Sequence, residues 1–145
     1  MKRQHATRPG GAPLLDRQAF KTAVFARDGG RCVICGAAAV DAHHILDRKL
    51  FADGGYYLGN GSSLCGDCHI EAEKTLICVE TIRAACGIVD PVLPAGFLAS
   101  GIYDKWGNRK SGEGRWRPGP LFGDDGARKI LAAAGLLYSG IFEMT

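Results

Sequence analysis

The spacing of apolar residues predicts a series of short helices and strands. Over residues 17–27, Phe20 and Val24 recur on one face of a helix, and Asp16 stands where an N-cap is expected. The segments "AAAVDAHHIL" and "SSLCGDC" are compatible with two short strands, and "HIEAEKTLI" has a helical pattern that starts at the end of the second strand. The segment "VETIRAACG" either extends that helix or forms a second one, closed by Gly87.

The pattern weakens after Gly87. Two prolines make "VDPVLPAGF" irregular, and "DKWGNRKSGEGRWRPGP" is a basic, glycine-rich segment with two tryptophans. A last helix is expected in "DDGARKILAAAGLLY", capped by Asp124 or Asp125. We therefore expect an α+β protein with a flexible basic tail over 1–13, a domain over 14–87, and a helical C-terminal extension over 88–145 packed on it.

Length and composition suit one domain with an appendage. The chain has 145 residues, and its apolar share of 46% is ordinary for a globular protein. No apolar run reaches 18 residues, and the basic N-terminus lacks the apolar stretch of a secretion signal, so we expect a cytoplasmic protein without a membrane span. In a reducing compartment, six cysteines favour metal or redox chemistry over disulfides, although Cys78 and Cys86 stand alone and are expected as small buried apolar residues.

Charge is distributed unevenly along the chain. The net charge is +3, made of +5 over residues 1–31, −3 over 32–78 and +1 over 79–145. A mildly basic chain permits a polyanionic partner without requiring one. An acidic centre between basic flanks is what a cation-binding site would produce, and chance produces the same pattern.

Two Cys-x2-Cys pairs predict a metal site. Cys32 and Cys35 are separated from Cys65 and Cys68 by 29 residues. Each two-residue gap lets both thiolates of one turn face the same ion, and four thiolates complete the tetrahedron that structural Zn²⁺ prefers. Redox motifs or buried thiols are the alternatives, but a redox Cys-x2-Cys normally follows a strand in a βαβ unit, which the pattern does not show.

A histidine pair completes a longer motif. His43 and His44 follow the first cysteine pair, Asn60 precedes the second pair by five residues, and His69 directly follows Cys68. With "RDGGRCVICG", "DAHHI" and "NGSSLCGDCH" in this order, residues 20–76 resemble the HNH endonucleases, which are ββα-metal nucleases. The resemblance covers somewhat under half of the chain. It implies a zinc-stapled ββα unit that hydrolyses DNA with the help of a second, divalent ion.

The resemblance also implies a role for each of these residues. His43 would bind the catalytic ion, and His44 would be the general base. Asn60 would tie down the loop between the two strands and so orient the base. His69 would be a second ligand of the catalytic ion, and the four cysteines would hold the structural zinc.

The expected chemistry explains the adjacent histidines. A divalent cation neutralises the charge that develops on a phosphodiester under attack, and an imidazole with a pKa of about 6.5 can take a proton from water near neutral pH. Neighbouring residues on a strand point to opposite sides, so His43 can face the ion while His44 faces the water.

The third ligand of the ion is open at this stage. Glu73 lies four residues after His69 and so on the same helix face. Some members of the resembled family have a histidine at that spacing, and the glutamate here favours Mg²⁺ or Mn²⁺. Asp41, two residues before His43, is the second candidate.

Basic residues flank these motifs and are candidates for contacts with DNA phosphates, which give affinity without sequence choice. Solvated surface charge is the plain alternative for each. The interleaved Trp and basic residues of 105–117 suit base stacking, but they equally suit a solvated loop with its tryptophans packed on the core. The candidates near the motifs are Arg27, Arg31, Arg48, Lys49 and Lys74.

Two other functions remain open. The histidines could be surface residues or ligands of the structural ion, in which case the chain is a zinc-dependent nucleic-acid-binding module without catalysis, or a zinc domain that binds proteins. A binding module has no need of His44 as a base, which favours the enzyme. A monomer would offer one catalytic centre and would nick DNA, whereas cutting both strands needs a dimer or two encounters.

Overall fold

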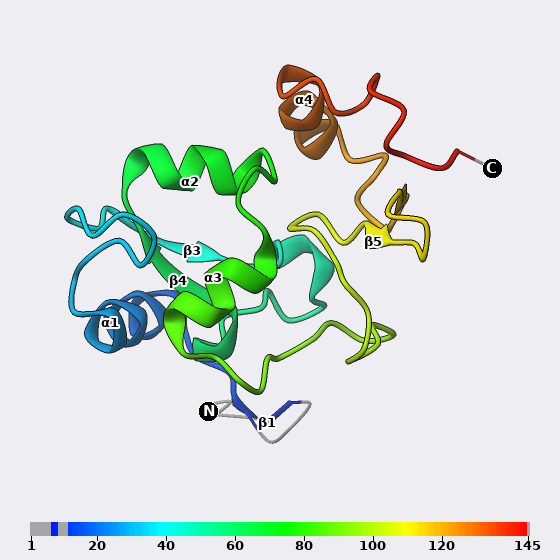
Figure 1. The fold of residues 1–145 in the computed structure, drawn as a ribbon. Helices are drawn as coiled ribbons and strands as arrows, with labels where there is room; N and C mark the ends of the chain where they lie inside the picture. The colour runs from blue at the N-terminus through cyan, green and yellow to red at the C-terminus, as the bar shows by residue number, and fades with distance from the viewer. Residues whose placement is uncertain (1–6, 9–11, 145) are drawn as a thin grey trace.

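The computed structural model describes residues 7–8 and 12–144, and it shows a small mixed α/β architecture (Figure 1). This agrees with the expected combination of helices and strands in one small protein. Short 3-10 turns, η2 (Arg48–Leu50) and η3 (Leu58–Asn60), connect the central strands. The strands are β1 (Thr7–Arg8), β2 (Ala12–Pro13), β3 (Asp41–His44), β4 (Gly61–Leu64), β5 (Arg109–Lys110) and β6 (Trp116–Arg117). The helices are α1 (Arg17–Asp28), α2 (Gly66–Glu73), α3 (Val79–Cys86) and α4 (Asp125–Ala133).

Local signals define the starts of α1 and α4 as predicted. Asp16 caps α1 by accepting a hydrogen bond from the backbone N–H of Ala19 at 2.8 Å. Gly29 ends α1 in the left-handed conformation, with a φ of 71°, which a residue without a Cβ adopts at little cost. Asp124 caps α4 in the same way as Asp16, through the N–H of Ala127.

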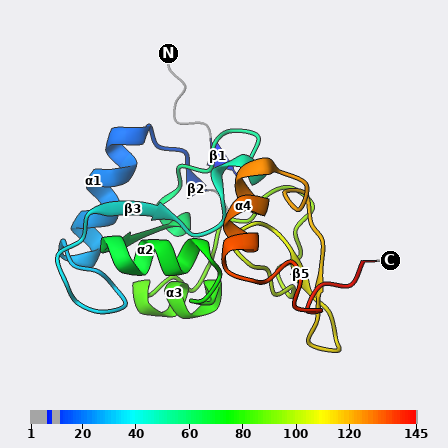
Figure 2. The same ribbon diagram turned by 90° about the horizontal axis from the view of Figure 1, so that it is seen from above.

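The central pair of strands lies between two helices. β3 and β4 are antiparallel, with Asp41 opposite Leu64 and His44 opposite Gly61. Figures 1 and 2 show β3 between α1 on one side and α2 on the other. Helix α1 buries Phe20 and Val24 against the strands, and α2 starts within two residues of the end of β4. The two faces of β3 therefore meet different helices.

The segment after α2 forms a separate helix rather than an extension. Thr75, with a φ of 60°, turns the chain away, and α3 follows and ends at Gly87. The expectation that both isolated cysteines are buried is wrong for Cys78, which is exposed because it stands at the N-cap of α3. Cys86 is half-buried on the last turn of α3, and burial raises the pKa of its thiol to about 11.

Two apolar clusters hold the chain together. The larger one packs the strands against α2 and α3, and it includes Ile45, Leu64 and Ile82. Val92 and Tyr103 of the C-terminal extension belong to this cluster, so the extension packs on the rest of the chain. The smaller cluster lies around α4, beside α2 in Figure 2, and consists of Trp106, Ala127, Leu131 and Phe142 with partly buried neighbours.

The N-terminal segment is described only in part. Within the predicted tail, β1 pairs antiparallel with β2, so these four residues have regular structure. The prediction of flexibility for 1–6 and 9–11 lies outside the described residues. Nowhere in the described chain is a helix both long and apolar enough to cross a membrane.

The contact between α1 and β4 predicts the effect of one methyl group. A Cβ on Gly61 would lie 2.5 Å from Cγ2 of Val24 and 2.7 Å from Cε1 of Phe20. We expect Gly61→Ala to lower the free energy of unfolding by about 1–3 kcal/mol, because the helix must move off the strand. Urea denaturation measures this. Gly112→Ala, where the added atom meets none of the described residues within 4 Å, is the control, and equal stabilities of the two variants would contradict this packing.

Candidate metal centres

The four cysteines of the two Cys-x2-Cys pairs converge on one point. Their sulfur atoms all lie within 4.8 Å of one another, and the Sγ atoms of Cys35 and Cys65 are 3.5 Å apart. The first pair lies in a tight turn in which Gly36 donates its N–H to the carbonyl of Cys32. The second pair brackets the start of α2, where Cys65 is the N-cap and accepts from the N–H of Cys68. This cluster could hold a structural metal such as zinc.

The thiols of this cluster differ in how readily they ionise. Burial opposes ionisation of Cys32, but backbone hydrogen bonds at Cys35, Cys65 and Ile34 outweigh it and lower the pKa of Cys32 to about 6. Burial and the neighbouring thiols raise the pKa of Cys68. Four thiolates at this separation repel one another, so only a bound cation lets all of them ionise together.

A second cluster forms where β3 faces α2. Ligand atoms of His43, His69 and Glu73 all lie within 4.8 Å of one another, so these residues could also hold a metal ion. His43 is 2% exposed, and neither of its ring nitrogens has a hydrogen-bond partner within the described part of the chain. A buried polar group normally has a partner, and an imidazole with two unpaired nitrogens fits a metal ligand. Burial lowers the pKa of His43, so the ring is neutral, as metal binding requires.

The geometry distinguishes the two candidates for the third ligand. Within the cluster, Nε2 of His69 lies 3.2 Å from Oε2 of Glu73. Asp41 is outside the cluster and 58% exposed, and its Oδ2 lies 3.3 Å from the other nitrogen of His69, Nδ1. Glu73 is therefore placed to bind an ion with His69, whereas Asp41 lies near Nδ1 of His69 without a hydrogen bond to it.

His44 points away from this cluster. Its ring stacks on Phe20 with 4.8 Å between centroids, and the edge of Tyr56 lies at the same distance. Phe20 and Tyr56 line a groove of about 590 Å³, and His44 lines it too. Its basic lining residues are Arg17, Lys21 and Arg48. His43 therefore faces α2, and His44 faces the groove.

The environment of His44 keeps its imidazole uncharged. Burial, followed by the positive charge of Lys105, lowers the pKa of His44 to about 4. A hydrogen bond to the backbone of Gly54 partly offsets this by raising the pKa of His44, and it holds the ring. Its Nε2 is enclosed and has no protein partner among the described residues.

Asn60 fastens the loop that joins β3 to β4. Its side chain is fully buried, and its amide exchanges two hydrogen bonds of 3.0 Å with the backbone of Leu46. The same amide nitrogen donates to the carbonyl of Gly55 at 3.4 Å. Because Gly54 contacts His44, Asn60 fixes both chain segments beside this histidine.

The five basic residues proposed for DNA contact have different positions. The guanidinium of Arg27 donates to Asp28 and to the carbonyls of Leu58 and Gly61, so it serves the packing of α1 on β4, and its contact with DNA stays a prediction. Arg48 is exposed and lines the groove. The other three are not in the groove.

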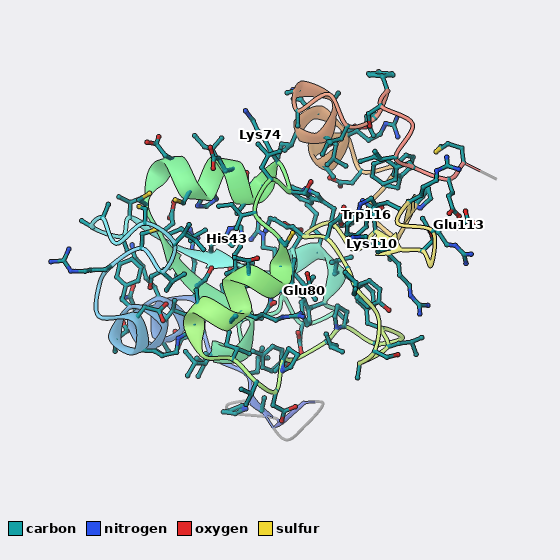
Figure 3. The ribbon with its side chains drawn as sticks, in the orientation of Figure 1. His43, Lys74, Glu80, Lys110, Glu113 and Trp116 are labelled. Carbon is teal, nitrogen blue, oxygen red and sulfur yellow. The ribbon has the colours of Figure 1, made fainter. Side chains whose placement is uncertain are left out.

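Those three remain at or near the surface. Arg31 is exposed and donates to the carbonyl of Gly36, on the first cysteine turn. Lys49 is exposed and pairs with Asp124 at 3.2 Å. Lys74 is half-buried at the C-terminal end of α2 (Figure 3).

Sequence reasoning missed three cations near the site. Arg17 and Lys21 lie one helical turn apart on α1 and line the groove. Their i, i+4 spacing could have predicted that both lie on the same helix face. Lys105 is 4% exposed, and its amine donates to the carbonyl of His44 at 2.7 Å. No local pattern in the basic, glycine-rich segment distinguishes Lys105 from a solvated lysine.

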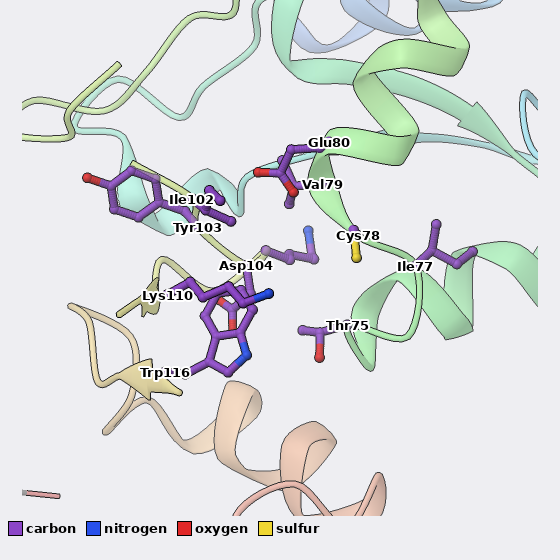
Figure 4. Close-up of a pocket in the computed structure, with 11 residues that line it drawn as sticks. Thr75, Ile77, Cys78, Val79, Glu80, Ile102, Tyr103, Asp104, Lys110 and Trp116 are labelled. Carbon is purple, nitrogen blue, oxygen red and sulfur yellow. The ribbon is translucent and has the colours of Figure 1, made fainter. Parts of the chain in front are cut away.

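The tryptophans of this segment also differ from each other. Trp106 is 5% exposed and packed in the smaller apolar cluster, so the alternative of a tryptophan packed on the core is correct for it. Trp116 is half-buried and, with Thr75, Tyr103 and Lys110, lines a cavity of about 170 Å³ between the α2–α3 connection and the β5–β6 hairpin (Figure 4).

Comparisons with protein-family models, with curated proteins and with solved structures found no match. The function of these two centres is therefore argued from the chemistry of their own residues.

The cysteine cluster predicts that one exposed thiol is essential for stability. Cys35→Ser should reduce bound zinc well below one ion per chain and lower the melting temperature, because part of the roughly 10–16 kcal/mol of zinc binding is lost. Metal analysis and a thermal unfolding curve measure both effects. Cys78→Ser changes an equally exposed cysteine outside the cluster and should keep zinc and stability. Full zinc content in the Cys35 variant would refute the four-cysteine site.

The depressed pKa of His44 predicts a loss of stability in mild acid. The unfolded chain binds a proton at this residue below about pH 6.5, whereas the folded chain binds it only near pH 4, so stability falls as pH drops through this window. Between pH 7.5 and 5.5, His44 should contribute a loss of about 1.3 kcal/mol. Urea denaturation of the zinc-loaded protein and of His44→Gln at both pH values isolates this contribution. Parallel losses in the two proteins would contradict it.

Proposed function

We propose that this protein is an HNH-type endonuclease that hydrolyses DNA phosphodiester bonds with the help of a divalent ion. The observation that carries the proposal is the opposite orientation of two neighbouring imidazoles. One unpaired nitrogen of His43 lies within 4.8 Å of ligand atoms of His69 and Glu73, and His44 lines a cationic groove that also reaches Asp41, whose carboxylate lies 3.3 Å from His69. A protein that only binds zinc or DNA has no need of this arrangement.

The cysteine cluster would supply the scaffold for this chemistry. Zinc bound there links the turn before β3 to the first turn of α2, and α2 carries both His69 and Glu73. A structural ion at this position holds the ligand helix against the strand that carries His43 and His44. In this proposal β3, β4 and α2 form a zinc-stapled ββα unit.

His43, His69 and Glu73 would hold the catalytic ion. Two imidazoles and one carboxylate bind Mg²⁺, Mn²⁺ or another divalent ion, depending on availability. Bound there, such an ion supplies charge neutralisation at the phosphodiester and at its leaving oxygen. Nε2 of His69 lies 3.2 Å from Oε2 of Glu73, so this nitrogen and the carboxylate would face the ion together.

His44 would accept the proton of the attacking water. With a pKa of about 4 it is neutral at physiological pH, so the ring is in the proton-accepting form. Phe20 and Tyr56 hold the ring in place, and Asn60 secures the loop around it. Because water attacks only once it lies beside the phosphodiester, the groove that His44 lines is where the substrate would be.

The cations of the groove suit a polyanion. Arg17, Lys21 and Arg48 line it, with Asp41 as the acidic residue at its rim. Lysine and arginine contacts to phosphates give affinity that is independent of base sequence and falls with salt concentration. These residues would hold the DNA backbone across β3.

Cleavage of supercoiled plasmid tests this function. Zinc-loaded wild type should nick the plasmid when Mg²⁺ or Mn²⁺ is added, and His44→Ala should lower the rate by about 10²–10⁴-fold, because no group takes the proton from water. Zinc content and DNA affinity, measured by metal analysis and gel shift, should be unchanged in the variant.

Other outcomes of that experiment would contradict the enzyme. A wild type that shifts DNA on a gel and cuts nothing in any divalent ion is a zinc-dependent nucleic-acid-binding module. A wild type without DNA affinity at low salt is a protein-binding zinc domain. Loss of zinc in His44→Ala would place this histidine in the structural site instead.

A further inference from the structure

The last residue of β3 is held by the C-terminal extension. The amine of Lys105 donates to the carbonyl of His44 at 2.7 Å and lies 3.6 Å from a carboxylate oxygen of Asp47. In return, the N–H of Asp47 donates to the carbonyl of Lys105 at 2.9 Å. Lys105 is 4% exposed and does not line the groove, so its amine makes no direct contact there. Two adjoining contacts therefore secure the chain where it leaves the candidate base.

The last residue of α2 is held by the next residue of the same segment. Nε1 of Trp106 donates to the carbonyl of Glu73 at 2.8 Å. Carbonyls at the end of a helix have no partner within the helix, so this bond fixes a group that is otherwise unsatisfied. The indole is also packed with Leu131 and Phe142 in the smaller apolar cluster. The end of α2 is thus attached to a separate packed unit.

The segment that makes both contacts is itself rigid. The buried carboxylate of Asp104 accepts hydrogen bonds from the backbone N–H groups of Trp106 and Asn108, both at 2.9 Å. It also accepts one from the side-chain amide of Asn108, whose oxygen accepts in turn from the N–H of Gly119. A loop with this many internal bonds keeps its shape without a ligand, so it can act as a fixed support.

Lys105 and Trp106 are adjacent, and each binds the end of one of the two elements that carry the candidate catalytic groups. We propose that they are positioning residues that clamp β3 to α2 and so set the distance from His43 to His69 and Glu73. The clamp complements the cysteine cluster, which holds the first turn of α2, whereas Trp106 holds the last. His69 lies between these two attachments, and Glu73 is the residue held by the second. The C-terminal extension is then part of the centre, an inference that rests on the proposed function.

Trp106→Phe tests the clamp without changing charge. The variant removes the indole N–H but leaves an aromatic ring in the cluster. Because the end of α2 is then less well held, the affinity of zinc-loaded protein for one Mn²⁺ ion should fall by about 10-fold, as for other losses of support around a metal ligand. Titration calorimetry measures the affinity. Trp116→Phe is the matched control and should keep the wild-type affinity, because Trp116 is outside the clamp.

Lys105→Met tests the other half of the clamp through catalysis. Loss of a positive charge near the centre would itself favour cation binding, so the readout here is cleavage at saturating Mn²⁺. We expect kcat for plasmid nicking to fall about 10-fold while KM for DNA stays within about twofold, because the variant misplaces His44 without touching the groove. Lys129→Met, which changes an exposed lysine of α4, should keep both constants.

The outcomes separate the clamp from the proposed function. Unchanged Mn²⁺ affinity in Trp106→Phe, even with a lower melting temperature, would reduce Trp106 to a packing residue and overturn the clamp. Unchanged kcat in Lys105→Met would do the same for Lys105. A wild type that binds Mn²⁺ but cuts no DNA overturns the nuclease, while weaker Mn²⁺ binding in Trp106→Phe still supports the clamp. A wild type that binds zinc alone overturns both.

Discussion

The register of β3 against β4 is the constraint on which the candidate site depends. Side chains alternate along a strand, so a shift by one residue would turn His43 toward α1 and His44 toward α2. The pairing of His44 with Gly61 is specified by close packing, because Phe20 and Val24 of α1 occupy the space where a Cβ of Gly61 would lie. Phe20 also stacks on His44. The ring of Phe20 therefore holds both His44 and Gly61 in place.

The two candidate metal centres offer different sets of donors. Four sulfurs at the start of α2 form a closed set that suits a permanently bound ion, and they join distant parts of the chain. The two imidazoles and the carboxylate between β3 and α2 are only three donors, which in the proposed function would leave positions for water and substrate. Burying His43 with both nitrogens unpaired costs free energy in the absence of an ion. Such a cost is expected where a site is arranged for a ligand rather than for stability.

The basic residues show how little net charge says about a partner. Arg27 makes hydrogen bonds that pack α1 on β4, and Lys105 is buried and donates to the carbonyl of His44. The groove owes its cationic character to Arg17, Lys21 and Arg48. Basic residues with similar sequence context thus have different roles: some pack helices, one supports a strand, and others line the candidate substrate groove. Only the direction in which each side chain points distinguishes them.

Short-range features of the sequence were sufficient for the local structure. The caps at Asp16 and Asp124, the glycine that ends α1, and the two-residue gaps of the cysteine pairs depend on neighbours within four residues. The starts of α1 and α4 and the pairing of thiols within each turn could therefore be predicted. The alternation of a strand was also enough to predict that adjacent histidines face opposite sides. The resemblance to HNH enzymes added roles for these residues, which remain proposals.

Only the tertiary structure decided which distant groups meet. The choice of Glu73 over Asp41 depends on how α2 lies across β3, and the exposure of Cys78 depends on where the chain turns into α3. The contacts of Lys105 and Trp106 join residues that are 61 and 33 positions apart. Local sequence carries no signal for them, because such contacts are set by the packing of whole elements and not by the pattern within any one of them.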